Sequence, residues 1–166
     1  MIKKIFAFVA ITLVACLGAF ANKAEGGFFD AAIKESADSK KHLLFLYTGS
    51  TWCPACQYFE RKVLATDEWK TFANENVTFL VFDVAGRKIV NLTLNGKSIK
   101  GEGDKLATQF EEAERFVHTH NIRYLPTLMT YDHKTKKWRH INFELESTPA
   151  SFIKTLKSEW SGISSK

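Results

Sequence analysis

The segment Trp52-Cys53-Pro54-Ala55-Cys56 contains two thiols at a spacing that allows them to react with each other. Two cysteines three residues apart at the start of a helix lie one turn apart on the same face, so their sulfur atoms can reach disulfide distance. The first of them also lies where backbone N–H groups and the positive end of the helix dipole stabilise a thiolate. The pair therefore predicts reversible thiol–disulfide exchange.

The same pair of cysteines also occurs in structural disulfides and in half of a zinc site. A disulfide that closes so short a loop adds little stability, which argues against a purely structural bridge. A metal site would need further ligands, and the candidates are the two closely spaced histidines His118 and His120. Because these two side chains point apart on a helix, we predict no metal ligand and no cofactor.

The first residues have the pattern of an export signal rather than of a folded element. Two lysines precede an apolar run over residues 5–20, and Ala19-Phe20-Ala21 forms a cleavage site with small residues at both ends. We therefore predict a signal peptide over residues 1–21 and one domain over residues 22–166. The location that this predicts is periplasmic, or otherwise outside the cytoplasm.

A second interpretation of this segment is a lipoprotein signal. Residues 13–16 resemble a bacterial lipobox, in which Cys16 would be lipidated and become the mature N-terminus. An uncleaved anchor is less favoured, because the apolar run is shorter than the roughly 20 residues that a membrane span needs. Under every interpretation Cys16 belongs to the targeting segment, and any membrane contact is made through the signal or a lipid anchor.

Length and charge limit the remaining function classes. The chain has 166 residues, enough for one domain with a substantial core. Loss of Lys3 and Lys4 with the predicted signal lowers the formal net charge from +5 to +3. So small a charge, without basic clusters interleaved with aromatic residues, excludes nucleic acid as the expected partner. The acidic residues Glu111, Glu112 and Glu114 are expected on a solvated helix face.

Hydrophobic periodicity predicts helices that alternate with strands. The nearly continuous apolar run over 42–47 is typical of a central strand covered on both faces. Asn95-Gly96 favours a type I′ turn and predicts a β-hairpin over 89–99. The remaining predicted elements are helices over 28–40, 54–64, 67–74 and 104–120, a last helix that begins at Pro149, and strands over 77–84, 126–131 and 138–143. This order predicts an α/β fold in which a mixed central sheet has helices on both faces, with the cysteine pair beyond the carboxyl end of a central strand.

Residues 45–56 resemble the strand, loop and helix of secreted bacterial thioredoxin-like proteins, and Tyr124-Leu125-Pro126-Thr127 resembles the second landmark of that family. The resemblance extends over residues 28–160. It implies a thioredoxin fold with an inserted β-hairpin. It also implies that Cys53 is the attacking cysteine, that Cys56 is the buried resolving cysteine, and that Pro126 is in the cis form and faces them.

The resemblance further implies a substrate groove formed by four residues around the cysteines, namely Trp52, Pro54, Leu125 and Pro126. The backbone beside the proline would be free to pair with an extended peptide. In one respect the chain departs from the family. Many thioredoxins carry a buried acid on the strand before the motif, whereas this chain has Leu46 or Tyr47 there, so the proton acceptor for Cys56 is left open.

The predicted function is that of a thiol–disulfide oxidoreductase, a reductase or isomerase, that acts on cysteines of exported proteins. Pro54-Ala55 places no side-chain donor between the cysteines, which favours a reducing rather than a strongly oxidising pair. A reducing protein outside the cytoplasm needs electrons, which implies a membrane thiol reductase as partner. The alternatives are a non-catalytic thioredoxin-like binding module and a metal-handling thiol protein.

Overall fold

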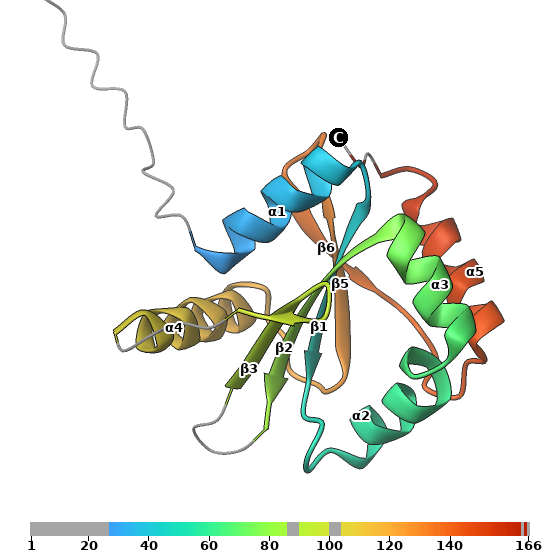
Figure 1. Ribbon diagram of the computed structural model, residues 1–166, viewed down its shortest axis with the longest axis horizontal. Helices are drawn as coiled ribbons and strands as arrows, with labels where there is room; N and C mark the ends of the chain where they lie inside the picture. The colour runs from blue at the N-terminus through green and yellow to red at the C-terminus, as the bar shows by residue number, and fades with distance from the viewer. Residues whose placement is uncertain (1–26, 86–89, 100–103, 164, 166) are drawn as a thin grey trace, which may run out of the picture.

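The described residues form a six-stranded sheet with the strand order β4-β3-β2-β1-β5-β6, and β1 lies at its centre (Figure 1). The computed structural model describes residues 27–85, 90–99, 104–163 and 165. The predicted signal peptide, the lipobox-like residues and Cys16 lie outside the described residues. No helix in the described ranges is long and apolar enough to cross a membrane.

The helices and strands follow one another in nearly the predicted order. Along the chain they are α1 (Phe28–Ser39), β1 (His42–Thr48), α2 (Pro54–Phe59), the π-helical turn η1 (Glu60–Leu64), α3 (Asp67–Asn76), β2 (Val77–Val84), β3 (Val90–Leu94), β4 (Lys97–Ser98), α4 (Asp104–Thr119), β5 (Thr127–Asp132), β6 (Lys137–Ile141) and α5 (Pro149–Trp160). β1 runs parallel to β2 and antiparallel to β5, which makes the sheet mixed as predicted.

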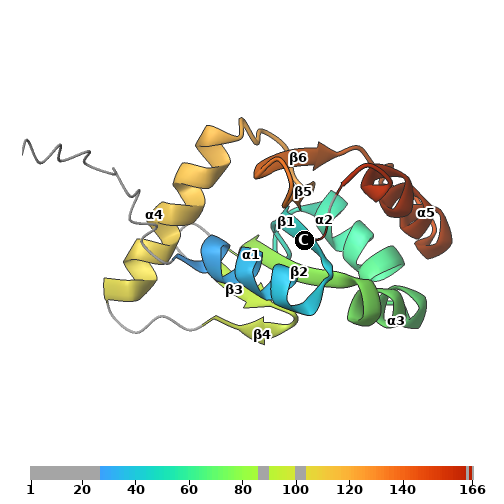
Figure 2. The same ribbon diagram turned by 90° about the horizontal axis from the view of Figure 1, so that it is seen from above.

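The central strand is apolar on both faces because each face is covered by helices. Leu43 and Phe45 belong to a core shared with α1 and α4. Leu44 and Leu46 belong to a second core, shared with α2, α3 and α5. Side chains alternate between the two faces of a strand, so a strand between two layers reads as a continuous apolar run. Figures 1 and 2 show the two helical layers on opposite sides of the sheet.

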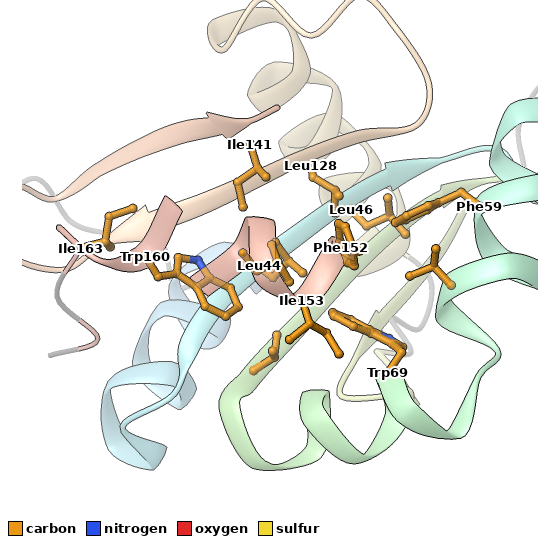
Figure 3. Packing of buried hydrophobic residues seen from close by; sticks show 13 residues of the cluster. Leu44, Leu46, Phe59, Trp69, Leu128, Ile141, Phe152, Ile153, Trp160 and Ile163 are labelled. Carbon is orange, nitrogen blue, oxygen red and sulfur yellow. The ribbon is translucent and has the colours of Figure 1, made fainter. Parts of the chain in front are cut away.

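Aromatic residues fill much of the second core. Trp69, Phe152 and Phe59 pack side by side there, with ring centroids 5.3 Å apart for Trp69–Phe152 and 5.1 Å apart for Phe59–Phe152 (Figure 3). Trp160 closes the other end of this core and donates its indole N–H to the hydroxyl of Thr130 at 3.0 Å. This core fixes α2, and therefore the cysteine pair at its start, against the sheet.

The helix predicted over 54–64 is continuous but changes its hydrogen bonding after Phe59. The N–H of Ala65 donates to the carbonyl of Glu60 at 2.8 Å, which is the wider pattern of a π-helical turn. The predicted hairpin is present, and Asn95 (φ 50°) and Gly96 (φ 74°) both have the positive φ of a type I′ turn. Its second strand, Lys97–Ser98, is only two residues long.

One surface prediction is wrong. Glu112 was expected on a solvated helix face, but its side chain is half-buried and reaches from α4 to the start of α1. Its carboxylate accepts the backbone N–H groups of Phe28 and Phe29 at 3.2 and 3.4 Å, and so caps a helix whose own N-cap residue, Gly27, has no side chain. Burial raises the pKa of the Glu112 carboxyl above its usual value, an effect that these two hydrogen bonds partly oppose.

Candidate active site

The cysteine pair lies where β1 has ended and α2 begins. Cys53 is the N-cap residue of α2, and Pro54 occupies the first helical turn, where its missing N–H group is harmless. Cys53 and Cys56 form a disulfide with their Cα atoms 5.2 Å apart. The backbone N–H of Cys56 points at the sulfur of Cys53, 3.2 Å away. A donor at this position stabilises negative charge on the Cys53 sulfur whenever the bond is reduced.

The loop before the cysteines is held by the end of the neighbouring strand, β2. Ser50 donates its N–H and its hydroxyl to the two carboxylate oxygens of Asp83, at 2.8 and 2.6 Å. Thr51 donates its hydroxyl to the carbonyl of Ala85 at 2.6 Å, and Trp52 donates its indole N–H to the carbonyl of Val84. These side-chain and backbone contacts fix the path of the chain into Cys53, so the sulfur is presented at a defined position.

Leu125 and Pro126 face the cysteine pair from the other side. The sulfur of Cys53 lies 3.9 Å from the carbonyl oxygen of Leu125, and the Leu125–Pro126 peptide bond is cis. The structure therefore brings together two segments, around residues 53 and 126, that the sequence could relate only by resemblance. Thr127 donates its hydroxyl to the carbonyl of Tyr124 at 2.6 Å and closes the turn before β5.

The two cysteines differ in exposure less than their positions suggest. Cys53, the predicted attacking cysteine, is only 6% exposed, against 1% for Cys56. The exposed surface nearby is aromatic instead, with Trp52 at 55% and Tyr124 at 79%. Leu125 and Pro126 are half-buried, and Pro54 is exposed. Tyr124 was not among the predicted site residues, although its place directly before Leu125-Pro126 was visible in the sequence.

Leu46 and Tyr47 are the two residues that could occupy the position of the buried acid found in many thioredoxins. Leu46 is the one on the Cys56 side of the sheet. Leu46 and Cys56 line the same cavity. Tyr47 instead stacks on Phe82 on the opposite face, with ring centroids 5.3 Å apart. Burial, and then the charge of Glu114, raises the pKa of the Tyr47 hydroxyl. The position that faces Cys56 is therefore apolar in this chain.

The histidines considered as metal ligands lie apart from the cysteines. His118 is exposed, whereas His120 packs on Phe116 with ring centroids 4.2 Å apart. Burial, and then the nearby His140, lowers the pKa of His120. Among the described residues, no three or more histidine, cysteine, aspartate or glutamate side chains are grouped so as to hold a metal ion.

Fold and site together define a class of protein in which a Cys-x-x-Cys pair follows a central strand of a mixed sheet and is faced by an X-Pro segment. A family model described as a thioredoxin-like domain matches residues 29–156, and the chain belongs to that family. No curated protein matches the chain.

Two solved structures show the same fold at low sequence identity. One of them, "DsbH Oxidoreductase", is 20% identical, with a TM-score of 0.54 over 78% of this chain and 79% of that one. A thioredoxin from Thermus thermophilus is 13% identical, with a TM-score of 0.54 over 80% of this chain and 84% of that one. The predicted thioredoxin fold is confirmed by the family match and by these neighbours.

One buried residue at this site, Asp83, was not predicted from the sequence. It lies on β2, directly beside Thr48 at the end of β1 in the parallel register. The residue is 9% exposed, and it is the aspartate that holds Ser50. A signal was present, because an aspartate inside an otherwise apolar strand needs hydrogen-bond partners.

Proposed function

We propose that this protein is a thiol–disulfide oxidoreductase that reduces or isomerises disulfides of exported proteins through Cys53 and Cys56. The observation that carries the proposal is the position of the Cys53 sulfur, which lies between a resolving thiol on its own helix and the Leu125 carbonyl opposite. Membership of the thioredoxin-like family supports it. One of the two structural neighbours is itself named an oxidoreductase, which supports the same reaction class.

In the reducing direction the Cys53 thiolate attacks one sulfur of a substrate disulfide, and the other substrate sulfur leaves as a thiolate. The resulting mixed disulfide is then attacked by Cys56, which forms the Cys53–Cys56 bond and releases the second substrate thiolate. Two electrons pass from the protein to the substrate. If a different cysteine of the substrate attacks the substrate sulfur of the mixed disulfide instead, a new substrate disulfide forms, Cys53 leaves as the thiolate, and the net result is isomerisation.

The groove that we assign to the substrate consists of Trp52, Pro54, Leu125 and Pro126. The exposed ring of Trp52 supports this role, because exposed aromatic side chains are frequent contact residues at binding surfaces. A peptide laid along Leu125 would bring its own sulfur towards Cys53. Neither Pro54 nor Ala55 has a side-chain donor that could stabilise a thiolate further, which supports a reducing pair.

The experiment that tests this activity is reduction of insulin by protein purified from cells that express the full chain. We expect turnover with dithiothreitol as electron source, and none with the Cys53→Ser variant. Against glutathione the potential should lie nearer the roughly −270 mV of thioredoxin than the roughly −120 mV of the strong oxidant of this fold. A protein that neither reduces insulin nor repairs a scrambled disulfide would be the non-catalytic binding module. Tight stoichiometric binding of zinc or copper by the reduced protein would favour the metal-handling alternative.

The location and the electron donor are part of the same proposal. Residues 1–21 would direct export, and a membrane thiol reductase would keep the pair reduced. N-terminal sequencing of the mature protein distinguishes the two forms of the signal, since it begins near Asn22 after signal cleavage and at a lipid-modified Cys16 in a lipoprotein. Acid trapping of cells followed by alkylation with a mass tag should find the pair mostly as the dithiol. A pair found mostly oxidised would contradict the proposed direction.

A further inference from the structure

The second step of the proposed exchange requires that Cys56 lose a proton in a buried place. A thiol attacks a disulfide as the thiolate, and apolar surroundings disfavour that charged form. Cys56 is 1% exposed, and the β1 residues that line the cavity beside it, Leu46 and Thr48, carry no acid. A proton acceptor for Cys56 must therefore come from another element.

A cavity beside Cys56 offers a route for that proton. It has a volume of about 500 Å³ and lies between α2, the turn η1, α3 and the strands β2 and β3. Leu46, Phe59 and Val81 contribute apolar wall, whereas Thr48, Ser50 and Asp83 contribute polar groups. A water molecule occupies about 30 Å³ of liquid, so a cavity with this volume and these polar partners accommodates several.

Asp83 is the acid best placed in this cavity. Both of its carboxylate oxygens are held by Ser50, at 2.8 and 2.6 Å. A carboxylate oxygen has two acceptor positions, so each still has one available for water. Among the described residues, the other titratable groups that line the cavity are Cys56 itself, Glu60 and Lys70. Glu60 is exposed, which places its carboxylate under solvent screening and leaves it free to move.

We propose that Asp83 accepts, through water in this cavity, the proton that Cys56 loses when it attacks the mixed disulfide. The proposal rests on the proposed exchange reaction. The Cys56 S–H bond breaks, its proton passes to the Asp83 carboxylate, and the sulfur forms its bond to Cys53. The bond between Cys53 and the substrate sulfur breaks, and that sulfur leaves as a thiolate. Asp83 then returns the proton to solvent through the open side of the cavity. Ser50 is a positioning residue that fixes the carboxylate.

The two steps can be measured separately with 5,5′-dithiobis(2-nitrobenzoate) as the disulfide substrate. Attack by Cys53 releases the first coloured thiolate, and attack by Cys56 on the mixed disulfide releases the second. Because Asp83 also holds Ser50 in the loop before Cys53, we expect Asp83→Asn to slow the first step slightly. We expect it to slow the second step at least about a hundredfold more than the first at neutral pH, the lower end of the range for lost proton transfer. The pH profile of the second step should also lose a carboxylate inflection. Glu60→Gln is the matched control and should change neither step.

Each other outcome overturns the proposal. A second step that Asp83→Asn leaves unchanged removes Asp83 from the reaction, and slowing by Glu60→Gln alone assigns the proton to Glu60. Equal slowing of both steps by Asp83→Asn shows a structural role only. Failure of the unsubstituted protein to release either thiolate would instead disprove the exchange reaction itself.

A measurement on the unsubstituted protein covers the case in which Asp83→Asn does not fold. In the unsubstituted protein, the second step should be slower in D2O than in H2O because a proton is transferred in it, whereas the first step, attack by the Cys53 thiolate, should change little. A second step that is equally fast in D2O would overturn the proposal.

Discussion

The sulfur of Cys53 lies 3.9 Å from the backbone carbonyl oxygen of Leu125, although 72 positions separate these residues in the sequence. The antiparallel pairing of β5 with β1 produces this contact, since it returns the segment before β5 to the edge at which β1 ends. In the proposed exchange, a peptide bound along this segment would bring its disulfide to the cysteine at the start of α2. The same contact gives the two cysteines different neighbours, with Leu125 beside Cys53 and the cavity beside Cys56.

Because Cys53 and Cys56 have different neighbours, we expect different results when each cysteine is replaced. Cys56→Ala should accumulate mixed disulfides between Cys53 and substrate proteins, because the resolving step is lost. Cys53→Ser should accumulate none. Non-reducing gels and mass spectrometry of material captured from cells would measure both. Adducts on Cys56 in the Cys53→Ser variant would reverse the assignment of attacking and resolving cysteine.

The exposed ring of Trp52 predicts a difference between large and small substrates. Trp52→Ala should lower kcat/KM for insulin reduction by about tenfold, the equivalent of ~1.4 kcal/mol for a lost aromatic contact. Reaction with 5,5′-dithiobis(2-nitrobenzoate) should change little, because that molecule needs no extended groove. Trp52→Phe serves as the control, since it retains an aromatic ring but loses the indole N–H that bonds to Val84. Equal losses with both substrates would show that Trp52 acts on the cysteine loop rather than on the substrate.

Two histidines at the end of the sheet away from the cysteines, His42 and His133, lead us to expect a less stable fold in mild acid than at neutral pH. Burial, and then the charge of His133, lowers the pKa of His42 from its ordinary value of 6.5, and burial also lowers the pKa of His133. The folded protein therefore binds fewer protons than the unfolded chain as the pH falls below 6.5. Stability is fully present above that value and is lost as the pH falls through the depressed pKa values. The free energy of unfolding in urea should be smaller at pH 5.5 than at pH 7.5.

A single substitution connects this pH dependence to His42. Its ring stacks on Trp160 with centroids 4.4 Å apart and planes 6° from parallel. His42→Phe keeps an aromatic ring in this place but removes the titrating group, so the difference between pH 5.5 and pH 7.5 should shrink. His118→Phe, at an exposed position of α4, is the control and should leave the pH dependence unchanged. An unaltered difference in His42→Phe would assign the effect to other histidines.

The start of α3 depends on one threonine hydroxyl. Thr66 is the N-cap residue, and its side chain accepts the backbone N–H of Trp69 at 3.3 Å. Thr66→Ala should lower the free energy of unfolding by about 1 kcal/mol, as the loss of an N-cap commonly does. Thr71→Ala, at an exposed position inside the same helix, should be neutral or slightly stabilising because alanine has the higher helix propensity. Equal effects of the two substitutions would contradict a capping role, and urea titration measures both.

Local sequence patterns were sufficient for the secondary structure and for the reactive pair. Three local patterns specify a conformation through side-chain periodicity or turn preference. The central strand is found at the apolar run over 42–47, the hairpin at Asn95-Gly96, and the last helix after Thr148-Pro149. Element ends shifted by one to a few residues, as for β5 and β6, because terminal residues have few hydrogen bonds to fix them. The wider turn after Phe59 had no such local signal.

Three features depend on the tertiary structure, and only the first of them was implied beforehand, by the family resemblance. Leu125 reaches Cys53, Asp83 holds Ser50, and Glu112 caps the start of α1. In each case the partners are distant in sequence, and only strand pairing or helix packing brings them together. Periodicity reports which side of an element is apolar, but not which polar group on another element will satisfy a buried donor. The sequence by itself therefore determined the cysteines and the strand and helix around them, whereas the tertiary structure decided which groups face each sulfur.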